Sequence, residues 1–284
     1  MKIPYTQYTK DNLEHAMAHY KATGEILDVL LVCFDQHGNW SDLPDSFDLE
    51  EPANLSDQVI PENRLVAISS TEEKILLCSF IDSSADPVNL DCHHVAGCIA
   101  LAKTRQFSAP NLQTVGAHLV APSATIFNIP KLREVGQFLN ACSATRFDAP
   151  SLQTVGDFLL AQSATIIDIT KLHTVGGFLD VRLAKSFDAP SLKHVDNSLH
   201  AAAACTFSAP NLQIVDGFLI VESAIIFDAQ NLETVNGALI AGSATTFNAS
   251  KLVRVDGELI LPVVTKVAVM PNCPVVRYKV ADQI

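Results

Sequence analysis

Residues 147–166 read FDAPSLQTVGDFLLAQSATI, and this pattern returns along most of the chain, for example at residues 127–146 and 187–206. The unit occurs eight times between residues 107 and 266, with a degraded copy before it. Residues 20 positions apart, which we call a column, are invariant as leucine from Leu112 to Leu252 and as valine from Val115 to Val255. A fixed short period is typical of stacked arrays, in which each unit buries its apolar face against its neighbours. The sequence therefore predicts a solenoid.

The length of the unit indicates β-structure, because a repeated pair of helices needs about 33 residues or more. One strand and a tight return would fit. We expect the strand at Phe158–Ala161 and its equivalents, with Leu159 and Ala161 facing inward and Phe158 and Leu160 facing outward, since strand side chains alternate. Stacking would then give a parallel sheet with about 4.8 Å between coils. The expected fold class is a mainly β parallel solenoid.

The unit resembles the short bacterial leucine-rich repeat, whose length is also about 20 residues. Residues 139–141 look like the strand of that repeat, and residues 149–152 (APSL) look like its L-P-x-L segment. The resemblance covers residues 87–266, and the rhythm is also similar to that of receptor L domains. It departs from the family where Ser143-Ala144 replaces the inward asparagine, and where the spacing from Val135 to Leu139 is four positions rather than three. The resemblance implies a protein-binding sheet.

The flanking segments lack the period and are expected to cover the two ends of the solenoid, where core and strand edges would otherwise be exposed. We assign residues 1–86 to an acidic α+β N-terminal cap domain, 87–266 to the solenoid and 267–284 to a C-terminal cap. Within the first of these we expect a helix at 11–23, a buried strand at 26–34, a surface loop at 41–63 and a hairpin formed by 65–69 and 74–82.

The net charge of −12 is unevenly placed, because residues 1–86 hold 5 Lys/Arg against 16 Asp/Glu. Such an acidic module argues against nucleic acid or an anionic membrane as partner and permits a basic protein. No apolar run reaches the roughly 18 residues of a membrane span, and the first ten residues lack the signal-peptide pattern. A cytoplasmic protein is expected, with export as an effector by an unrecognised signal left open.

The chain shows no P-loop, no GxSxG and no HExxH motif, and its seven cysteines form no CxxC pair. We therefore predict no catalytic residues, no cofactor and no metal site. His15 and His19 share a face of the expected helix, but no third ligand is recognisable. The Asp, Asn and Ser column that includes Asp168 and Asp188 is interpreted as N-caps of short helical turns, with calcium binding as the alternative.

An enzyme is the alternative function. Pectin-cleaving β-helices have a similar coil length and place acidic and basic residues on one outer sheet. Asp180, Arg182 and His200 are expected outward on neighbouring coils, where they could do acid–base work. This interpretation predicts a carbohydrate-active hydrolase or lyase.

The outward columns beside the expected strand are mainly apolar, and they are the predicted binding face. The proposed binding residues are Phe138, Phe158, Phe178, Phe218 and Leu160. Contiguous exposed apolar surface usually marks an interface, and aromatic residues dominate interface energetics. The sequence thus favours a non-enzymatic module for protein–protein interaction, with a protein partner, for example a basic one, or a second copy of the chain.

Overall fold

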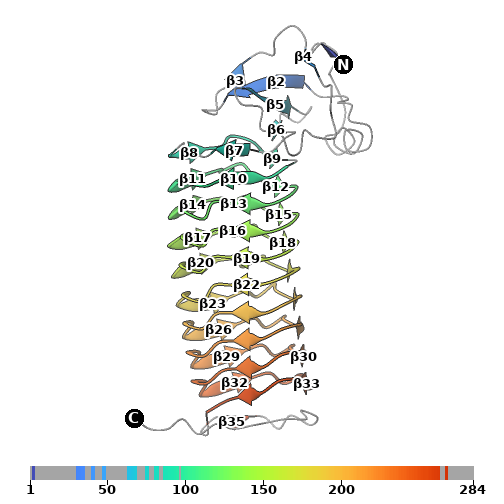
Figure 1. The fold of residues 1–284 in the computed structure, drawn as a ribbon. Coiled ribbons are helices and arrows are strands. Elements are labelled where there is room, and N and C mark those ends of the chain that lie inside the picture. Colours follow the sequence, from blue (N-terminus) through green and yellow to red (C-terminus); the bar gives the residue numbers. More distant parts are fainter. Residues whose placement is uncertain are drawn as a thin grey trace.

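The computed structural model describes residues 86–95 and 97–262 together with strands placed within residues 2–82 and at 266–267. The repeats form a parallel β-solenoid in which each coil lies directly on the previous one (Figure 1). Each complete coil carries three short strands, and each strand joins a different sheet, in which it runs parallel to its copies in the neighbouring coils. Among the described residues there is no helix long and apolar enough to cross a membrane.

We name the sheets after the residue type that recurs in their repeat strands, which is the leucine of Leu119–Leu259, the valine of Val115–Val255 and the phenylalanine of Phe107–Phe247. The leucine sheet contains β7 (Phe80–Asp82), β10 (Ile99–Leu101), β13 (Leu119–Val120), β16 (Leu139–Asn140), β19 (Leu159–Leu160), β22 (Leu179–Asp180), β25 (Leu199–His200), β28 (Leu219–Ile220), β31 (Leu239–Ile240) and β34 (Leu259–Ile260). The valine sheet contains β3 (Trp40–Ser41), β2 (Leu30–Asp35), β5 (Asn63–Ile68), β6 (Lys74–Leu76), β9 (His94–Val95), β12 (Thr114–Val115), β15 (Glu134–Val135), β18 (Thr154–Val155), β21 (Thr174–Val175), β24 (His194–Val195), β27 (Ile214–Val215), β30 (Thr234–Val235) and β33 (Arg254–Val255).

The third side of the solenoid is made of two phenylalanine sheets. The first contains β8 (Val88–Asn89), β11 (Gln106–Ser108), β14 (Ile126–Asn128), β17 (Arg146–Asp148) and β20 (Ile166–Asp168). The second contains β23 (Ser186–Asp188), β26 (Thr206–Ser208), β29 (Ile226–Asp228), β32 (Thr246–Asn248) and β35 (Lys266–Val267). A separate antiparallel pair joins β1 (Lys2–Ile3) to β4 (Phe47–Asp48).

The parallel stacking expected from the period is confirmed, since the strands of the repeats pair in register with their copies in the next coil, as Leu159 does with Leu179, except between β20 and β23. The expectation of a single strand per coil is wrong, because the valine and phenylalanine columns also form strands. Each strand has only two or three residues in the repeats between β11 and β34. Alternation over so few residues is too weak to be recognised as a strand in the sequence.

The core is built from columns of identical side chains that stack on one another. Leu159 and Ala161 face inward, as predicted from alternation. In the coil 147–166 the side chains with no exposed surface are Phe147, Ala149, Leu152, Val155, Leu159, Ala161 and Ala164. Burying a leucine or phenylalanine in this way stabilises the fold by about 1.5–3 kcal/mol per side chain.

The Ala-Pro-x-Leu segment is a β-turn rather than the short helical turn that the sequence predicts. The N–H of Leu152 donates to the carbonyl oxygen of Ala149 over 3.0 Å. Pro150 occupies the second position of this turn, where its fixed φ is favourable. Asp148 lies two residues before Pro150, and proline has no N–H that could donate to its carboxylate. The predicted cap occurs at Asp168, where Thr170 replaces proline and its N–H lies 3.4 Å from Asp168 Oδ1.

Glycines close the corner between the valine and leucine strands because the coils approach too closely there for a side chain. A Cβ atom on Gly156 would lie 2.1 Å from the carbonyl oxygen of Gly136. From residue 196 onward the first corner position is Asp or Asn, and glycine takes the second position in three successive coils. A Cβ atom on Gly237 would lie 2.7 Å from the backbone of Gly217. Gly176 and Gly177 fill both positions in the coil before the change.

The same region of the solenoid interrupts the phenylalanine side. Ile167 replaces phenylalanine in its column, β20 ends the first phenylalanine sheet and β23 begins the second. Beyond the interruption the rings stack face to face, with centroids 4.9 Å apart for Phe187 and Phe207. Before it, Phe107 and Phe127 meet edge to face with an interplanar angle of 65°. The leucine and valine sheets continue past this point.

At the N-terminal end, two sheets of the solenoid extend into residues 1–86. β5 and β6 pair antiparallel, which agrees with the first part of the hairpin predicted there. The predicted second arm at 74–82 is not one strand, because it is divided into β6, which pairs with β9, and β7, which pairs with β10 in another sheet. The buried strand expected at 26–34 overlaps β2. The predicted helix at 11–23, most of the loop at 41–63 and most of the C-terminal cap at 267–284 lie outside the described residues.

Candidate functional site

The outward face of the leucine sheet carries the predicted binding residues. Phe138, Phe158 and Phe178 are half-buried on successive coils, and Phe218 is 51% exposed. Phe138 and Phe158 stack with centroids 4.4 Å apart and an interplanar angle of 18°. His118 stacks on the other side of Phe138 at 4.7 Å. Because these rings belong to successive coils, their faces cover one another and their edges form the outer surface. We call Phe138, Phe158, Phe178, Phe218 and Leu160 the aromatic row.

The row changes character after Phe178. This ring packs edge to face against His200 with centroids 4.8 Å apart. In the next coil the column holds Ser198, whose hydroxyl oxygen accepts the N–H of Phe218 over 2.9 Å. Phe218 therefore projects from a backbone position that is held by a hydrogen bond, with half of its surface free. Leu160, in the adjacent outward column, is half-buried beside Asp180.

The structure brings Asp180, Arg182 and His200 together, as the sequence predicts for neighbouring coils. Asp180 and His200 are direct partners in the leucine sheet. Asp180 is only 1% exposed, although its column faces outward. Its Oδ1 accepts a hydrogen bond of 3.0 Å from Arg182 Nε, and its Oδ2 accepts one of 2.9 Å from Gln162 Nε2. Arg182 also forms an ion pair with this carboxylate.

These contacts shift the pKa values of Asp180 and His200. Burial alone would raise the pKa of Asp180, but hydrogen bonds and the positive charge of Arg182, together with Gln162, hold it below its ordinary value. Burial lowers the pKa of His200, an effect opposed by the carboxylates of Asp180 and Glu222 and reinforced by Arg182. Asp180 is thus a fixed anion whose oxygens are both occupied. A general base needs a free oxygen within reach of substrate, so this arrangement stabilises the coil more readily than it performs acid–base chemistry.

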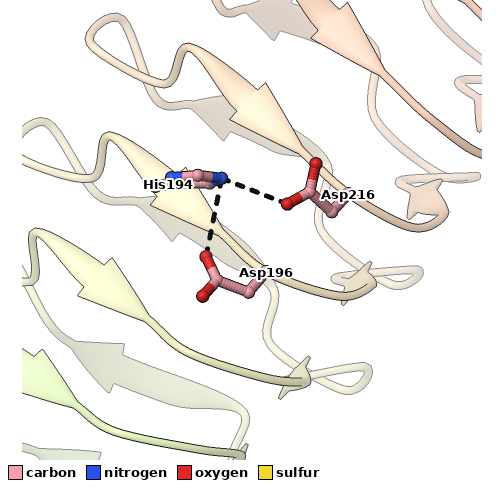
Figure 2. A group of neighbouring side chains, drawn as sticks. All are labelled: His194, Asp196 and Asp216. Atoms are coloured by element: carbon pink, nitrogen blue, oxygen red, sulfur yellow. Dashed lines mark hydrogen bonds and ion pairs between the residues drawn. The ribbon is translucent and has the colours of Figure 1, made fainter.

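A second cluster lies at the end of the valine strands and is not found by the sequence reasoning. His194 belongs to β24, Asp196 follows that strand, and Asp216 follows β27 one coil away. Figure 2 shows the imidazole between the two carboxylates. His194 Nε2 lies 3.5 Å from Asp196 Oδ1 and 3.4 Å from Asp216 Oδ2. The signal in the sequence is the change of the corner column from glycine to aspartate at positions 196 and 216, which stack because they occupy the same place in successive coils.

Asn236 and Asp256 occupy the same corner position in the two coils beyond the cluster. Asn236 Nδ2 donates to Asp216 Oδ1 over 2.8 Å. One coil further, Arg254 Nε donates to Asp256 Oδ1 over 2.6 Å. The Asp column on the phenylalanine side behaves similarly, since Asn248 Nδ2 donates to Asp228 Oδ1 over 2.7 Å. His15 and His19, the metal pair considered from the sequence, lie outside the described residues.

Comparison with protein-family models, with curated proteins and with solved structures gave no match. The repeat solenoid therefore rests on the sequence period and the structure alone. The leucine-rich-repeat resemblance gains no support from a relative, and three strands per coil differ from the single strand that it implies.

Proposed function

We propose that this protein is a non-enzymatic binding scaffold whose aromatic row contacts a protein partner. The observation that carries the proposal is the outward position of four phenylalanines on one sheet, with Phe218 half exposed. Half-exposed aromatic side chains supply much interface area at little cost in side-chain entropy. The edge-outward packing of Phe138 and Phe158 favours an apolar protein surface over a flat sugar ring, because a sugar would stack on ring faces that are already covered.

Two features of the sequence support a protein as the partner, and in particular a basic protein. The short leucine-rich repeats that the unit resembles bind proteins through their sheet. Residues 1–86 carry a net charge of −11, which would attract a basic partner and speed its association, an effect that salt weakens. The proposal is therefore a cytoplasmic protein that binds another protein through the aromatic row. A second copy of the chain could bind through the same face.

The carbohydrate-active alternative would place chemistry at Asp180, Arg182 and His200. Glycoside hydrolysis commonly uses two carboxyl groups about 5–9.5 Å apart, one on each side of the scissile bond. Asp180 has both oxygens engaged by Arg182 and Gln162. This observation makes the trio a weaker basis for function than the aromatic row.

The proposal is tested with Phe218→Ser and a matched control, Ile226→Ser. Ile226 is 47% exposed but belongs to the phenylalanine side, so both variants remove similar exposed apolar surface from different faces. Self-association is measured by sedimentation velocity, and proteins captured from the cells of origin are compared by quantitative mass spectrometry. We expect Phe218→Ser to weaken association more than tenfold while Ile226→Ser leaves it unchanged. Equal binding by both variants, or loss in both, would move the binding face away from the aromatic row.

A further inference from the structure

We propose that His194, Asp196 and Asp216 form a binding site for a divalent transition-metal ion of the Zn²⁺ class. One ligand atom from each residue lies within 4.8 Å of the others. Zn²⁺ binds imidazole nitrogen and carboxylate oxygen at about 2.0–2.2 Å, so neighbouring ligands of one ion lie about 3–3.5 Å apart. The distances of 3.4 and 3.5 Å from His194 Nε2 to the two carboxylates match this spacing. The side chains would need little movement to coordinate an ion.

The backbone holds these ligands in place through the coil-to-coil ladder. The N–H of Asp196 donates to Val175 O over 3.0 Å, and the N–H of Asp216 donates to Val195 O over the same distance. Asn236 fixes Oδ1 of Asp216 and leaves Oδ2 directed at His194. Hydrogen bonds to the second oxygen of a ligating carboxylate orient it and raise metal affinity.

The combination of ligands selects the class of ion. Ca²⁺ prefers six to eight oxygen ligands, and Mg²⁺ keeps a largely aqueous octahedral shell. One imidazole with two carboxylates suits Zn²⁺ and the neighbouring first-row transition metals. The side chain of Asp196 is 50% exposed and that of Asp216 is 38% exposed, so water can fill the remaining coordination positions.

The corner geometry explains why the site begins at residue 196. In earlier coils a side chain at this position would collide with backbone, as the 2.1 Å approach of a Cβ on Gly176 to Gly156 O shows. From residue 196 onward the first corner position carries Asp or Asn instead of glycine, so carboxylates can stack there. Stacked like charges destabilise neighbouring strands. A bound cation would offset the repulsion between Asp196 and Asp216.

Zinc titration of the full chain tests this proposal. Isothermal titration calorimetry with ZnCl₂ at neutral pH compares the wild type with His194→Ala, Asp216→Asn and the control Asp256→Asn. Asp256 occupies the same corner column two coils beyond Asp216 and pairs with Arg254. We expect His194→Ala and Asp216→Asn each to remove one equivalent of zinc or weaken it more than tenfold, while Asp256→Asn keeps it. Asn236→Ala should weaken the same equivalent by about 10–100-fold. CaCl₂ in excess should not displace the zinc.

The proposal is overturned if His194→Ala and Asp216→Asn bind as many zinc ions as the wild type with the same affinities. Equal losses in Asp256→Asn would also overturn it, because the effect would then be one of general negative charge. The ligands are at least partly exposed, so the variants should keep the wild-type circular dichroism, and Asp216→Asn preserves side-chain shape if His194→Ala perturbs folding. The titration uses no protein partner, so its result is independent of the aromatic row.

Discussion

Gly156→Ala tests the close approach of the coils at the glycine corner. The new methyl group would lie 2.1 Å from the carbonyl oxygen of Gly136, whereas ordinary van der Waals contact begins at 3.4 Å. The corner would have to open by roughly 1.3 Å, the difference between these distances. Two hydrogen bonds of 2.9 Å span this gap, from the N–H of Gly156 to Val135 O and from the N–H of Asp157 to Gln137 O. Opening of that size would break both.

The expected loss of stability follows from these contacts. Each broken hydrogen bond costs about 0.5–1.5 kcal/mol, and overpacking of a dense interior costs about 1–3 kcal/mol. We therefore expect Gly156→Ala to lower the free energy of unfolding by about 2–6 kcal/mol. The matched control is Gly242→Ala, because the nearest atom to its new methyl group, Glu222 O, is 3.9 Å away. That variant should be neutral or gain about 0.4–1 kcal/mol, since alanine restricts the unfolded chain.

Urea unfolding followed by circular dichroism measures both variants against the wild type. The midpoint for Gly156→Ala should fall clearly, and that for Gly242→Ala should stay or rise. If both variants unfold at the wild-type midpoint, the corner is not packed as tightly as the backbone positions indicate. If both fall equally, the loss comes from replacing glycine as such and not from contact between coils.

Two further predictions concern the core and the charged group. Phe207 stacks between Phe187 and Phe227, so Phe207→Ala should cost about 3–5 kcal/mol in the same urea assay and Phe207→Leu clearly less; equal costs would argue against the ring stack. The pKa values of Asp180 and His200 are both lowered by folding, so both contributions are present at high pH and are lost on acidification, from about pH 6.5 downward for His200 and from about pH 4 downward for Asp180. Between about pH 6.5 and pH 4, the melting temperature of His200→Gln should fall less than that of the wild type. Below about pH 4, the melting temperature of Asp180→Asn should fall less than that of the wild type. If the melting temperatures of both variants change with pH as that of the wild type does, the assignment is refuted.

The sequence predicts the solenoid and the inward columns because one physical requirement acts on every coil. Leu159 can be buried only against its copies above and below, so the same residue type recurs at the same step. The three strands of each coil were not predicted, because a two-residue strand such as Thr154–Val155 contains a single alternation. Its pairing partners in the two neighbouring coils, rather than its own composition, make it a strand.

The candidate sites, like the fold, could be predicted from the sequence only where the repeat period determines the position of a residue. The aromatic row could be placed because outward residues follow from alternation beside Leu159. The burial of Asp180 could not be predicted, since it depends on Gln162 and Arg182 folding over an outward position. The cluster at His194 required the repeat period to be applied to the corner column, where Asp196 and Asp216 stack. Its distances of 3.4 and 3.5 Å depend on how the side chains of adjacent coils are oriented, which the sequence does not show.

The interruption between β20 and β23 has a mechanical consequence. Two of the three sides of the rod are continuous there, while the third is divided into separate sheets beside Ile167. The third side keeps a hydrogen bond of 3.2 Å from the N–H of Lys185 to Thr165 O, but it lacks the strand ladder that the other two sides have, so bending should open or close this side most easily. The molecule should therefore flex at its middle in one preferred plane, with the leucine and valine sheets acting as the spine. Bending there would change the curvature of the surface on which Phe178 and Phe218 lie.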